Sequence, residues 1–578
     1  MFENSAVGVA EILAGLAAHA WFKRRDPVSL SKSTTVLAVV PSLPLLYSIY
    51  EQQGRVSFLS ASLVLQSYVI FYAALALSTA AYRLSPFHPL AQYPGPWYLR
   101  VNRSWPAWVA YRGKYHLFVK GLHDKYGPTV RVGPNDLSSV EKDLIQDVLG
   151  HHNMPKGPLW DGRRFLQTDT EKNKNYDSII DVRDSAIHAH LRKPWSKAFS
   201  AEPMVDYENM LIPRVNELNK CLKDVVKKSG DGVGKTDIAR WINYFAYDFM
   251  GDIAFGGAFD LMRDGDPRGQ HQAMGDGMYL ISIMQQIPWI YGLLRPFSRG
   301  MDSFINLGLE KSMERVNKGM TKKDLFYYMT ESGEVPDGGL EVIISNCLLA
   351  IVAGSDTSSS AMSNAFYFLL SHPDKYRKLQ KEIDNAYNTH QIPDLDVESD
   401  EVQSYHDVLA GLKYLNAVIN ETLRLVPSIG TGLQRAPSKG SGGHMLTGGD
   451  SKLNIWLPEG NACNIPPYVL QRDPRYFSPK PDEFIPERWI ESTGYTTARD
   501  AFIPFSYGPT NCVGRPLGMM ELRYVLATLV RNFLMEFDLT KGRPEEWVQA
   551  QEDRFTMANG QLNVNISLRS KKMRGLRH

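Results

Sequence analysis

The chain has few cysteines and little net charge. Its 578 residues include only four cysteines, which are widely spaced and form neither a Cys-x-x-Cys pair nor a disulfide-rich pattern. Such usage is typical of a protein in a reducing compartment. The formal net charge is only +2, whereas a nucleic-acid-binding protein carries a concentrated basic excess. We therefore expect no nucleic-acid partner.

The histidines also lack the spacing of a metal site. None of the 14 histidines stands in a His-Glu-x-x-His motif or in another recognisable metal-binding pair. With 43% hydrophobic and 11% aromatic residues, the chain can nevertheless bury a large core. Its length allows one large domain or a few ordinary ones.

Long apolar runs occur near the N-terminus. Three such stretches precede residue 90: residues 6–22, 35–50 and 58–82. Only the third is free of charged residues and has the length of about 20 residues that a membrane-spanning helix needs. Glu11 and His19 interrupt the first stretch, and Pro41 and Pro44 interrupt the second. Each of these two could cross the membrane or lie at its surface, so we expect one to three transmembrane helices.

Basic residues flank these stretches unequally. They are Lys23, Arg24, Arg25 and Lys32 after the first stretch, Arg55 before the third and Arg83 after it. If all three stretches cross, the positive-inside rule places the N-terminus in the lumen and the chain after Arg83 in the cytosol. If only the third stretch crosses, the chain after Arg83 is again in the cytosol provided that the start of this stretch faces the lumen. No basic segment precedes the first stretch, so we expect no cleavable signal peptide.

Residues 85–96 contain four prolines: Pro86, Pro89, Pro94 and Pro96. Because proline fixes φ, we expect this segment to be an extended, stiff spacer between the membrane segment and the globular part.

A cysteine near the C-terminus stands on a loop rich in glycine and proline. Residues 505–516 read Phe-Ser-Tyr-Gly-Pro-Thr-Asn-Cys-Val-Gly-Arg-Pro, and a helix-prone apolar run follows. Backbone N–H groups and the helix dipole at such a place favour a thiolate and can tune it as an iron ligand. Gly508 and Gly514 would allow a tight turn and the close approach of a flat macrocycle, and Phe505 could pack beside the Cys512 sulfur. The alternative is a buried structural cysteine in a turn.

Residues 340–371 form a long apolar run that predicts a helix of about 48 Å at 1.5 Å per residue. Residues 353–360 interrupt this run with a polar patch that includes Asp356 and Thr357. A glycine and back-bonding hydroxyls within a helix cost stability and can open its hydrogen-bond ladder. Such a cost indicates a functional role; a buried Ser/Thr packing patch is the alternative.

Glu421 and Arg424 share one face of another apolar helix, because they are three residues apart. Both would be costly to bury unless they are paired and hydrogen-bonded. Arg488, in the segment Phe-Ile-Pro-Glu-Arg-Trp at residues 484–489, is a candidate partner.

Together these motifs resemble the cytochrome P450 family. The cysteine loop matches the family pattern F-x-x-G-x-R-x-C-x-G except at Thr510, where the family usually has Arg or His. Residues 353–357 match A-G-x-D-T, residues 421–424 match E-x-x-R, and residues 486–489 are similar to P-E-R-F. The resemblance extends from about Pro94 to the end, and the chain looks most like membrane-bound fungal members.

The resemblance implies a mainly α fold with small β-sheets, the cytochrome P450 fold, behind an N-terminal transmembrane anchor. Residues 1–93 would form the anchor and hinge, and residues 94–578 the haem-thiolate catalytic domain. The implied cofactor is haem b, with its iron axially ligated by the Cys512 thiolate. Residues 279–294 would roof the substrate pocket or contact the membrane, with plain core packing as the alternative.

The resemblance also implies roles for residues around the haem. His188, at a position that often holds Trp, and Arg192 lie four residues apart on one helical face and would bind the haem propionates together with Arg435. For His188 and Arg192 the alternative is an exposed basic helix start. Thr357 and Asp356 would deliver protons. Glu421, Arg424 and Arg488 would form a buried structural triad in the core on the haem side.

The implied reaction inserts one atom of O2 into a hydrophobic small molecule, such as a fungal terpenoid or another secondary metabolite. Electrons would come from NADPH through a separate NADPH–cytochrome P450 reductase, at an endoplasmic reticulum membrane with the catalytic domain in the cytosol. Two alternatives are a haem-thiolate isomerase or dehydratase that needs no external electrons, and a non-enzymatic haem binder in the membrane.

Overall fold

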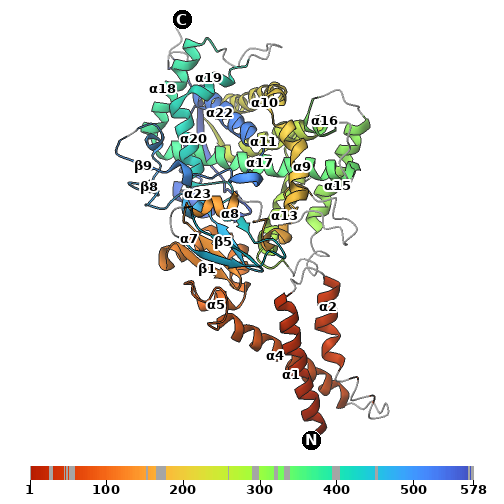
Figure 1. The fold of residues 1–578 in the computed structure, drawn as a ribbon. Helices are drawn as coiled ribbons and strands as arrows, with labels where there is room; N and C mark the ends of the chain where they lie inside the picture. Colours follow the sequence, from red (N-terminus) through yellow and green to blue (C-terminus); the bar gives the residue numbers. More distant parts are fainter. Residues whose placement is uncertain are drawn as a thin grey trace.

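The structure is a computed structural model. It describes residues 2–24, 30–43, 46, 50, 59–150, 154–163, 178–257, 259–267, 269–288, 299–317, 323–330, 339–392, 404–449, 453–491, 493–570 and 573–574. Helices dominate and the sheets are small, which confirms the fold class expected from the sequence. Helices at the N-terminal end stand apart from the large body that holds the rest of the chain (Figure 1).

The N-terminal helices are α1 (Phe2–Arg24), α2 (Leu30–Ala38) and α4 (Leu59–Leu84), with the short helix η1 (Val40–Ser42) after α2. Within the described residues, one helix is long and apolar enough to span a membrane, namely Ser62–Leu84 of α4, and only 11% of its most apolar window is buried inside the molecule. The second apolar stretch of the sequence is helical only over part of its expected range, and residues 44–45 and 47–49 lie outside the described residues.

Residues 85–93 of the proline-rich segment are not extended, so this expectation was wrong for them, whereas Pro96 at the end of the segment is extended. Residues 85–93 fold into successive turns, in which His88 N donates to Ser85 O at 3.3 Å and Ala91 N donates to His88 O at 2.9 Å. The φ that proline fixes suits turn positions as well as extended chain, and nearby carbonyls accept the available N–H groups. The segment leads into α5 (Trp97–Val101), which Arg83 ties to α4 because its Nη1 donates to Val101 O at 2.6 Å.

A four-stranded sheet lies at the end of the body near α5 (Figure 1), in the order β1-β2-β7-β4. Its strands are β1 (Thr129–Gly133), β2 (Asp136–Ser139), β7 (Ala462–Ile465) and β4 (Leu433–Arg435). Val130 pairs with Ser138 in antiparallel register, so β1 and β2 form a hairpin that turns at residues 133–135. Strand β7 runs parallel to β2 and antiparallel to β4, which places Arg435 on the edge strand of the sheet. Helix α7 (Tyr115–Tyr126) packs beside β1.

The remaining described elements complete the body. The strands are β10 (Phe533–Phe537), β13 (Asn563–Leu568) and β3 (Gly234–Asp237) in one sheet, and the pairs β11 (Glu552–Arg554) with β12 (Thr556–Ala558), β5 (Gly443–Leu446) with β6 (Ile455–Pro458), and β8 (Phe477–Ser478) with β9 (Thr496–Thr497). The helices are α6 (Ser104–Tyr111), α8 (Leu144–Leu149), η2 (Pro158–Arg163), α9 (Ser185–Ala198), α10 (Ala201–Lys228), α11 (Ile238–Phe255), α12 (Leu261–Asp264), α13 (Gln270–Met284), α15 (Arg299–Asn317), α16 (Leu325–Thr330), α17 (Gly339–Ser371), α18 (Pro373–Thr389), α19 (His406–Gly411), α20 (Lys413–Leu425), α21 (Pro467–Leu470), η5 (Pro486–Trp489), η6 (Arg499–Ala501), η7 (Gly508–Thr510), α22 (Arg515–Asn532) and α23 (Pro544–Ala550).

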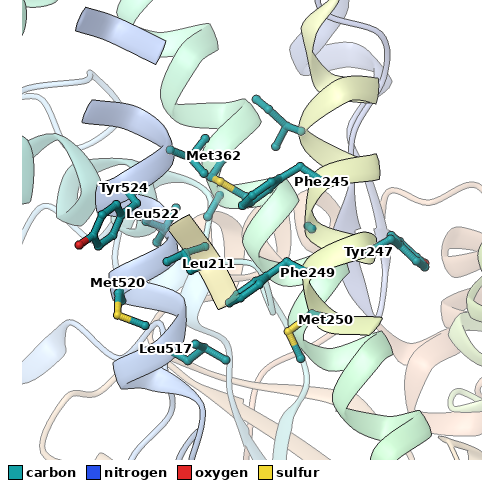
Figure 2. Close-up of a cluster of buried hydrophobic side chains, with 14 of the residues drawn as sticks. Leu211, Phe245, Tyr247, Phe249, Met250, Met362, Leu517, Met520, Leu522 and Tyr524 are labelled. Carbon is teal, nitrogen blue, oxygen red and sulfur yellow. The ribbon is translucent and has the colours of Figure 1, made fainter. Parts of the chain in front are cut away.

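The core lies where α10, α11, α17 and α22 meet. Figure 2 shows Phe249 and Met250 of α11 facing Leu517 and Met520 of α22, with Leu211 of α10 between them. Burial of such side chains stabilises the fold by about 1.5 to 3 kcal/mol each. The long helix α17, predicted from the sequence, therefore runs through the middle of the core.

Candidate functional site

The loop that carries Cys512 is shaped by a glycine and closed by a backbone hydrogen bond. Gly508 has a φ of +73°, and a Cβ at this position would lie 2.2 Å from Leu149 O. Only glycine fits such a place without strain. Cys512 N donates to Phe505 O at 2.9 Å, which closes the loop just before α22. A Cβ on Gly514 would lie 4.0 Å from the Cys512 sulfur, so the chain beside the thiol carries little bulk.

The Cys512 thiol is accessible although the surrounding protein is dense. The residue is exposed, yet burial is the largest effect on its thiol and raises the pKa, against the lowering effects of the Gly514 N–H group and the Arg192 guanidinium. The thiol therefore borders an internal space rather than bulk water. With the pKa raised, the free thiol holds its proton at neutral pH, and a metal ion must displace that proton to bind.

Helix α9 is tied to this loop. It begins at Asp184, whose Oδ1 accepts from Ala186 N at 2.8 Å and so caps the helix. About two turns further along, Arg192 Nη1 donates to Asn511 O at 2.6 Å and Nη2 donates to Asn511 Oδ1 at 2.8 Å. Arg192 thus holds the residue that precedes Cys512.

A cavity of about 180 Å³ opens beside the loop. Its lining includes Lys156, His188, Arg192, Arg435 and Thr510, and no acidic residue is among the described residues that line it. The structure therefore brings together the three residues expected at the propionates and adds a lysine that the sequence did not reveal.

Three of the basic groups of this cavity, Lys156, His188 and Arg435, are buried without a carboxylate partner among the described lining residues. Arg183, which also lines the cavity, is part-buried and pairs with Asp161 at 2.5 Å. Burial lowers the pKa of Lys156 to about 7, and its Nζ donates to the Ile179 and Ile180 carbonyls, both at 2.8 Å. Burial also lowers the pKa of His188 to about 3 and that of Arg435 to about 10. An anionic group in the cavity would offset this cost and raise these pKa values again. The cavity thus fits a group with more than one negative charge.

Thr510 is hydrogen-bonded to one of these basic groups. Arg435 Nη2 donates to Thr510 Oγ1, and Arg435 Nη1 donates to Gln434 O at 3.0 Å. The position that usually carries Arg or His in the resembling family thus holds a hydroxyl that orients a neighbouring guanidinium.

The polar patch of α17 uses its hydroxyls within the helix. Thr357 Oγ1 donates to Ala353 O at 2.5 Å, and Ser355 Oγ donates to Ile351 O at 2.6 Å. Both bonds are of the back-bonding kind expected from the sequence. Ala353 is exposed although Ile351 and Val352 beside it are buried. This face of α17 therefore borders an internal space, as the thiol does.

Asp356 turns toward α11. Tyr247 projects from α11 away from Phe249 (Figure 2), and its hydroxyl donates to Asp356 Oδ1 at 3.4 Å. Burial raises the pKa of Asp356 to about 7, although hydrogen bonds from Tyr247 and Thr556 act to lower it. This carboxyl can therefore take up and release a proton near neutral pH.

Glu421, Arg424 and Arg488 meet as a fully buried cluster. Glu421 accepts from Arg424 Nε at 2.8 Å and from Arg488 Nε at 3.0 Å, and none of the three side chains is exposed. Trp489 Nε1 adds a third donor to Glu421 at 3.0 Å. Gln471 accepts from Arg424 Nη1 through its backbone O at 2.8 Å. These bonds pair the buried charges of Glu421 and Arg424 and hold α20 against the chain around residues 471–489.

Sequence reasoning missed Lys156, Tyr247 and Glu521. Glu521 on α22 is 1% exposed, and burial raises its pKa to about 8 near the Ser358 hydroxyl. No motif marks Lys156 or Tyr247, since their neighbours come from distant segments. For Glu521 the available signal was its position, because it is an acidic residue within the apolar run after Cys512. Of the expected roof at residues 279–294, α13 covers the beginning, and residues 289–294 lie outside the described residues.

Comparison with known proteins agrees with this site. The sequence profile of the cytochrome P450 family matches residues 93–558. The cytochrome P450 monooxygenase nodW of Hypoxylon pulicicidum is 31% identical over 486 residues, which cover 83% of this chain and 82% of that protein. The tryprostatin B 6-hydroxylase of Aspergillus fumigatus is 29% identical over 88% of this chain and 85% of its own length. The trichothecene C-15 hydroxylase of Fusarium sporotrichioides is 29% identical over 83% and 93%, respectively. The chain therefore belongs to the cytochrome P450 family of haem-binding monooxygenases.

Proposed function

We propose that this chain is a haem-thiolate monooxygenase that inserts one oxygen atom from O2 into a hydrophobic small molecule. The observation that carries the proposal is the exposed Cys512, two residues from Thr510 in the wall of a cavity whose described lining residues include basic but no acidic side chains. Members of the family bind haem through a cysteine thiolate. Haem b presents an iron that accepts such a ligand and two carboxylates that need cations, so the residues present fit the group.

Each part of the haem would meet a matching group of this chain. Cys512 would ligate the iron, with Phe505, Gly508 and Gly514 shaping the loop around the sulfur. The propionates would bind four of the basic groups that line the cavity, namely Lys156, His188, Arg192 and Arg435, whereas Arg183 pairs with Asp161. The buried triad of Glu421, Arg424 and Arg488 would keep this side of the core rigid, which supports a structural role.

The bound haem supplies oxygen activation, in which a thiolate ligand favours O–O cleavage. The chain supplies protons and excludes water. Asp356 is suited to pass on protons because its pKa of about 7 lies near the working pH. Thr357 donates its own hydroxyl proton to Ala353 O, so its oxygen keeps lone pairs that can accept a hydrogen bond from a donor at the site.

We infer that residues 1–93 are a membrane anchor with its hinge and that residues 94–578 are the catalytic domain. The apolar span of α4 followed by Arg83 supports an endoplasmic reticulum membrane with the catalytic domain on the cytosolic side. Electrons would then come from NADPH through the separate NADPH–cytochrome P450 reductase of the same membrane.

The substrate class is inferred from the relatives. Two of them are named as hydroxylases, one of tryprostatin B and one of a trichothecene. A fungal secondary metabolite such as a terpenoid is therefore the proposed substrate, and the apolar surroundings of α17 suit a hydrophobic molecule.

The test is turnover under ¹⁸O2. Microsomes that contain the full chain and the reductase are incubated with NADPH and a panel of fungal terpenoids and indole alkaloids. We expect a product that carries one ¹⁸O atom and forms only when both NADPH and the reductase are present. A product that forms without NADPH and carries no label would indicate the isomerase or dehydratase instead.

A further inference from the structure

Helix α1 has a polar buried side and an apolar exposed side. The exposed large side chains of its first two thirds are Val9, Ile12, Leu13 and Leu16, each between 43% and 61% exposed. The buried positions are Glu11 at 0%, Gly15, and Ala18 at 4%. A helix on a soluble protein or on a membrane surface turns its charged residues toward water. The reverse arrangement is that of a helix surrounded by lipid, where ionisable side chains face the inside of a bundle.

The buried side of α1 packs closely on α4. A Cβ on Gly15 would lie 2.8 Å from both Ala74 Cβ and Phe71 O, so the two backbones touch at this glycine. Such close approach at small residues is how helices associate in membranes. Glu11 lies beside the Ser67 hydroxyl, which is itself only 2% exposed. Burial against α4 thus removes the Glu11 side chain, which stands in the middle of the apolar part of α1, from contact with lipid.

The two helices run in the same direction. In the first third of α1, a Cβ on Gly8 would lie 3.8 Å from Ile70 Cδ1, in the middle of α4. Near their ends, Lys23 Nζ lies 3.8 Å from the centroid of the Tyr82 ring. Two parallel spans require the chain between them to return across the membrane. In agreement, Tyr68 donates to Ala38 O and Tyr72 to Leu37 O, at 2.6 and 2.9 Å, so α2 runs antiparallel to α4.

We propose that α1 spans the bilayer beside α4 and parallel to it, with lipid acyl chains against its exposed apolar face. The proposal rests on the membrane location of α4 proposed above. The 23 residues of α1 reach about 34 Å, enough for a hydrocarbon core of about 30 Å. Hydropathy alone does not reveal this span, because Glu11 and the small residues lower the average. The start of α1 and the start of α4 then lie on the side of the bilayer opposite the catalytic domain, and the end of α1 lies on the same side as that domain.

Glycosylation mapping tests this topology in the full chain. An Asn-Ser-Thr acceptor within a short Gly/Ser insert is placed at the N-terminus, between residues 26 and 27, or between residues 53 and 54, and each variant is made in microsomes. We expect glycosylation at the first and third sites and none at the second. Glycosylation at the second site, or none at the first, would overturn the span of α1. Failure at the third site alone would instead overturn the proposed anchor, since α4 would then not start in the lumen.

Cross-linking tests the helix pair itself. Gly8→Cys is combined with Ile70→Cys, and a protease site is inserted between residues 53 and 54 so that a cross-link keeps the two fragments together. We expect oxidation to join the fragments in this variant at least tenfold more than in a control with Leu13→Cys, whose native side chain is 61% exposed, and Ile70→Cys. Gly8→Cys alone controls for native cysteines. Equal cross-linking of the two double variants would contradict the packing of α1 on α4.

Discussion

Single side chains set the charge balance of the haem site. Where most family members have Arg or His two residues before the cysteine, this chain has Thr510, which accepts a hydrogen bond from Arg435. Lys156 lies in the same cavity, with its pKa lowered to about 7 by burial. The missing cation in the loop is therefore offset by basic groups that other segments bring to the cavity.

Arg192→Ala is expected to lower haem occupancy. Arg192 lines the basic cavity and holds Asn511 through two hydrogen bonds. Hydrogen bonds to charged groups contribute about 1.5 to 3 kcal/mol, so haem affinity should fall by about ten- to a hundredfold. Haem per protein, measured as the pyridine haemochrome after dilution, checks this. Lys193→Ala, at an exposed neighbouring position, is the matched control. Full haem retention in Arg192→Ala would count against the assignment.

Tyr247→Phe is expected to shift the pH dependence of turnover toward higher pH. The Tyr247 hydroxyl stabilises the Asp356 carboxylate, so its loss raises the pKa of Asp356 further above about 7. The carboxyl then keeps its proton to higher pH. The pH above which the yield of product per NADPH consumed falls should therefore rise as well. Tyr244→Phe, also on α11, is the control. An unchanged profile, or a shift to lower pH, would show that Tyr247 does not act on Asp356.

Some site residues were predictable from spacing and others were not. Cys512 stands in a loop whose glycines and following helix define its surroundings locally, and Glu421 and Arg424 are neighbours on one helix. Lys156 has no such local signature, because its surroundings come from β4 and α9, far away in the sequence. A residue whose environment is built by tertiary packing is visible only in the fold.

Among the elements, α20 depends most on buried charge. Its Glu421 accepts hydrogen bonds from Arg424, Arg488 and Trp489, and the three charged side chains are fully buried. This cluster joins α20 to η5, since Arg488 Nε donates to Glu421 Oε1 at 3.0 Å across 67 positions of the chain.

Glu421→Gln is expected to destabilise the protein strongly. It leaves two buried guanidinium groups without a negative partner, which costs about 3 to 5 kcal/mol. The midpoint of urea-induced unfolding, followed by haem absorbance and tryptophan fluorescence, should fall clearly. The matched control is Lys378→Ala, which removes a partner of Glu487 from a pair at 3.0 Å whose lysine is 52% exposed. Such a pair contributes under about 1 kcal/mol. Equal midpoints for the two variants would contradict the role of the triad.

The regular elements were more predictable than the connections. Helix α17 begins one residue before the expected position and ends where expected, because a long apolar run and His372-Pro373 mark its bounds. The segment 85–96 shows the opposite case. Proline composition alone did not distinguish extended chain from turns, since both accept the same φ, and the hydrogen-bond partners that decide between them lie outside composition.

In the described part of the chain, an N-terminal end with one helix long and apolar enough to span a membrane stands apart from a body built around buried helices (Figure 1). The formal net charge is only +2, whereas a strongly basic surface of the kind that binds nucleic acid would give a larger positive charge. The fold class and the family followed from motif order over the C-terminal half. The arrangement of α1 against α4 did not, because mean hydropathy does not record which side of a helix is buried.

The most direct test of the account is the absorption spectrum of the dithionite-reduced full-length protein with and without carbon monoxide, for wild type and Cys512→Ser. We predict a strongly red-shifted Soret band in the wild type that is absent in the variant, which would establish thiolate-ligated haem at Cys512. A histidine-type band, or no haem in folded wild-type protein, would contradict the proposed haem-thiolate monooxygenase.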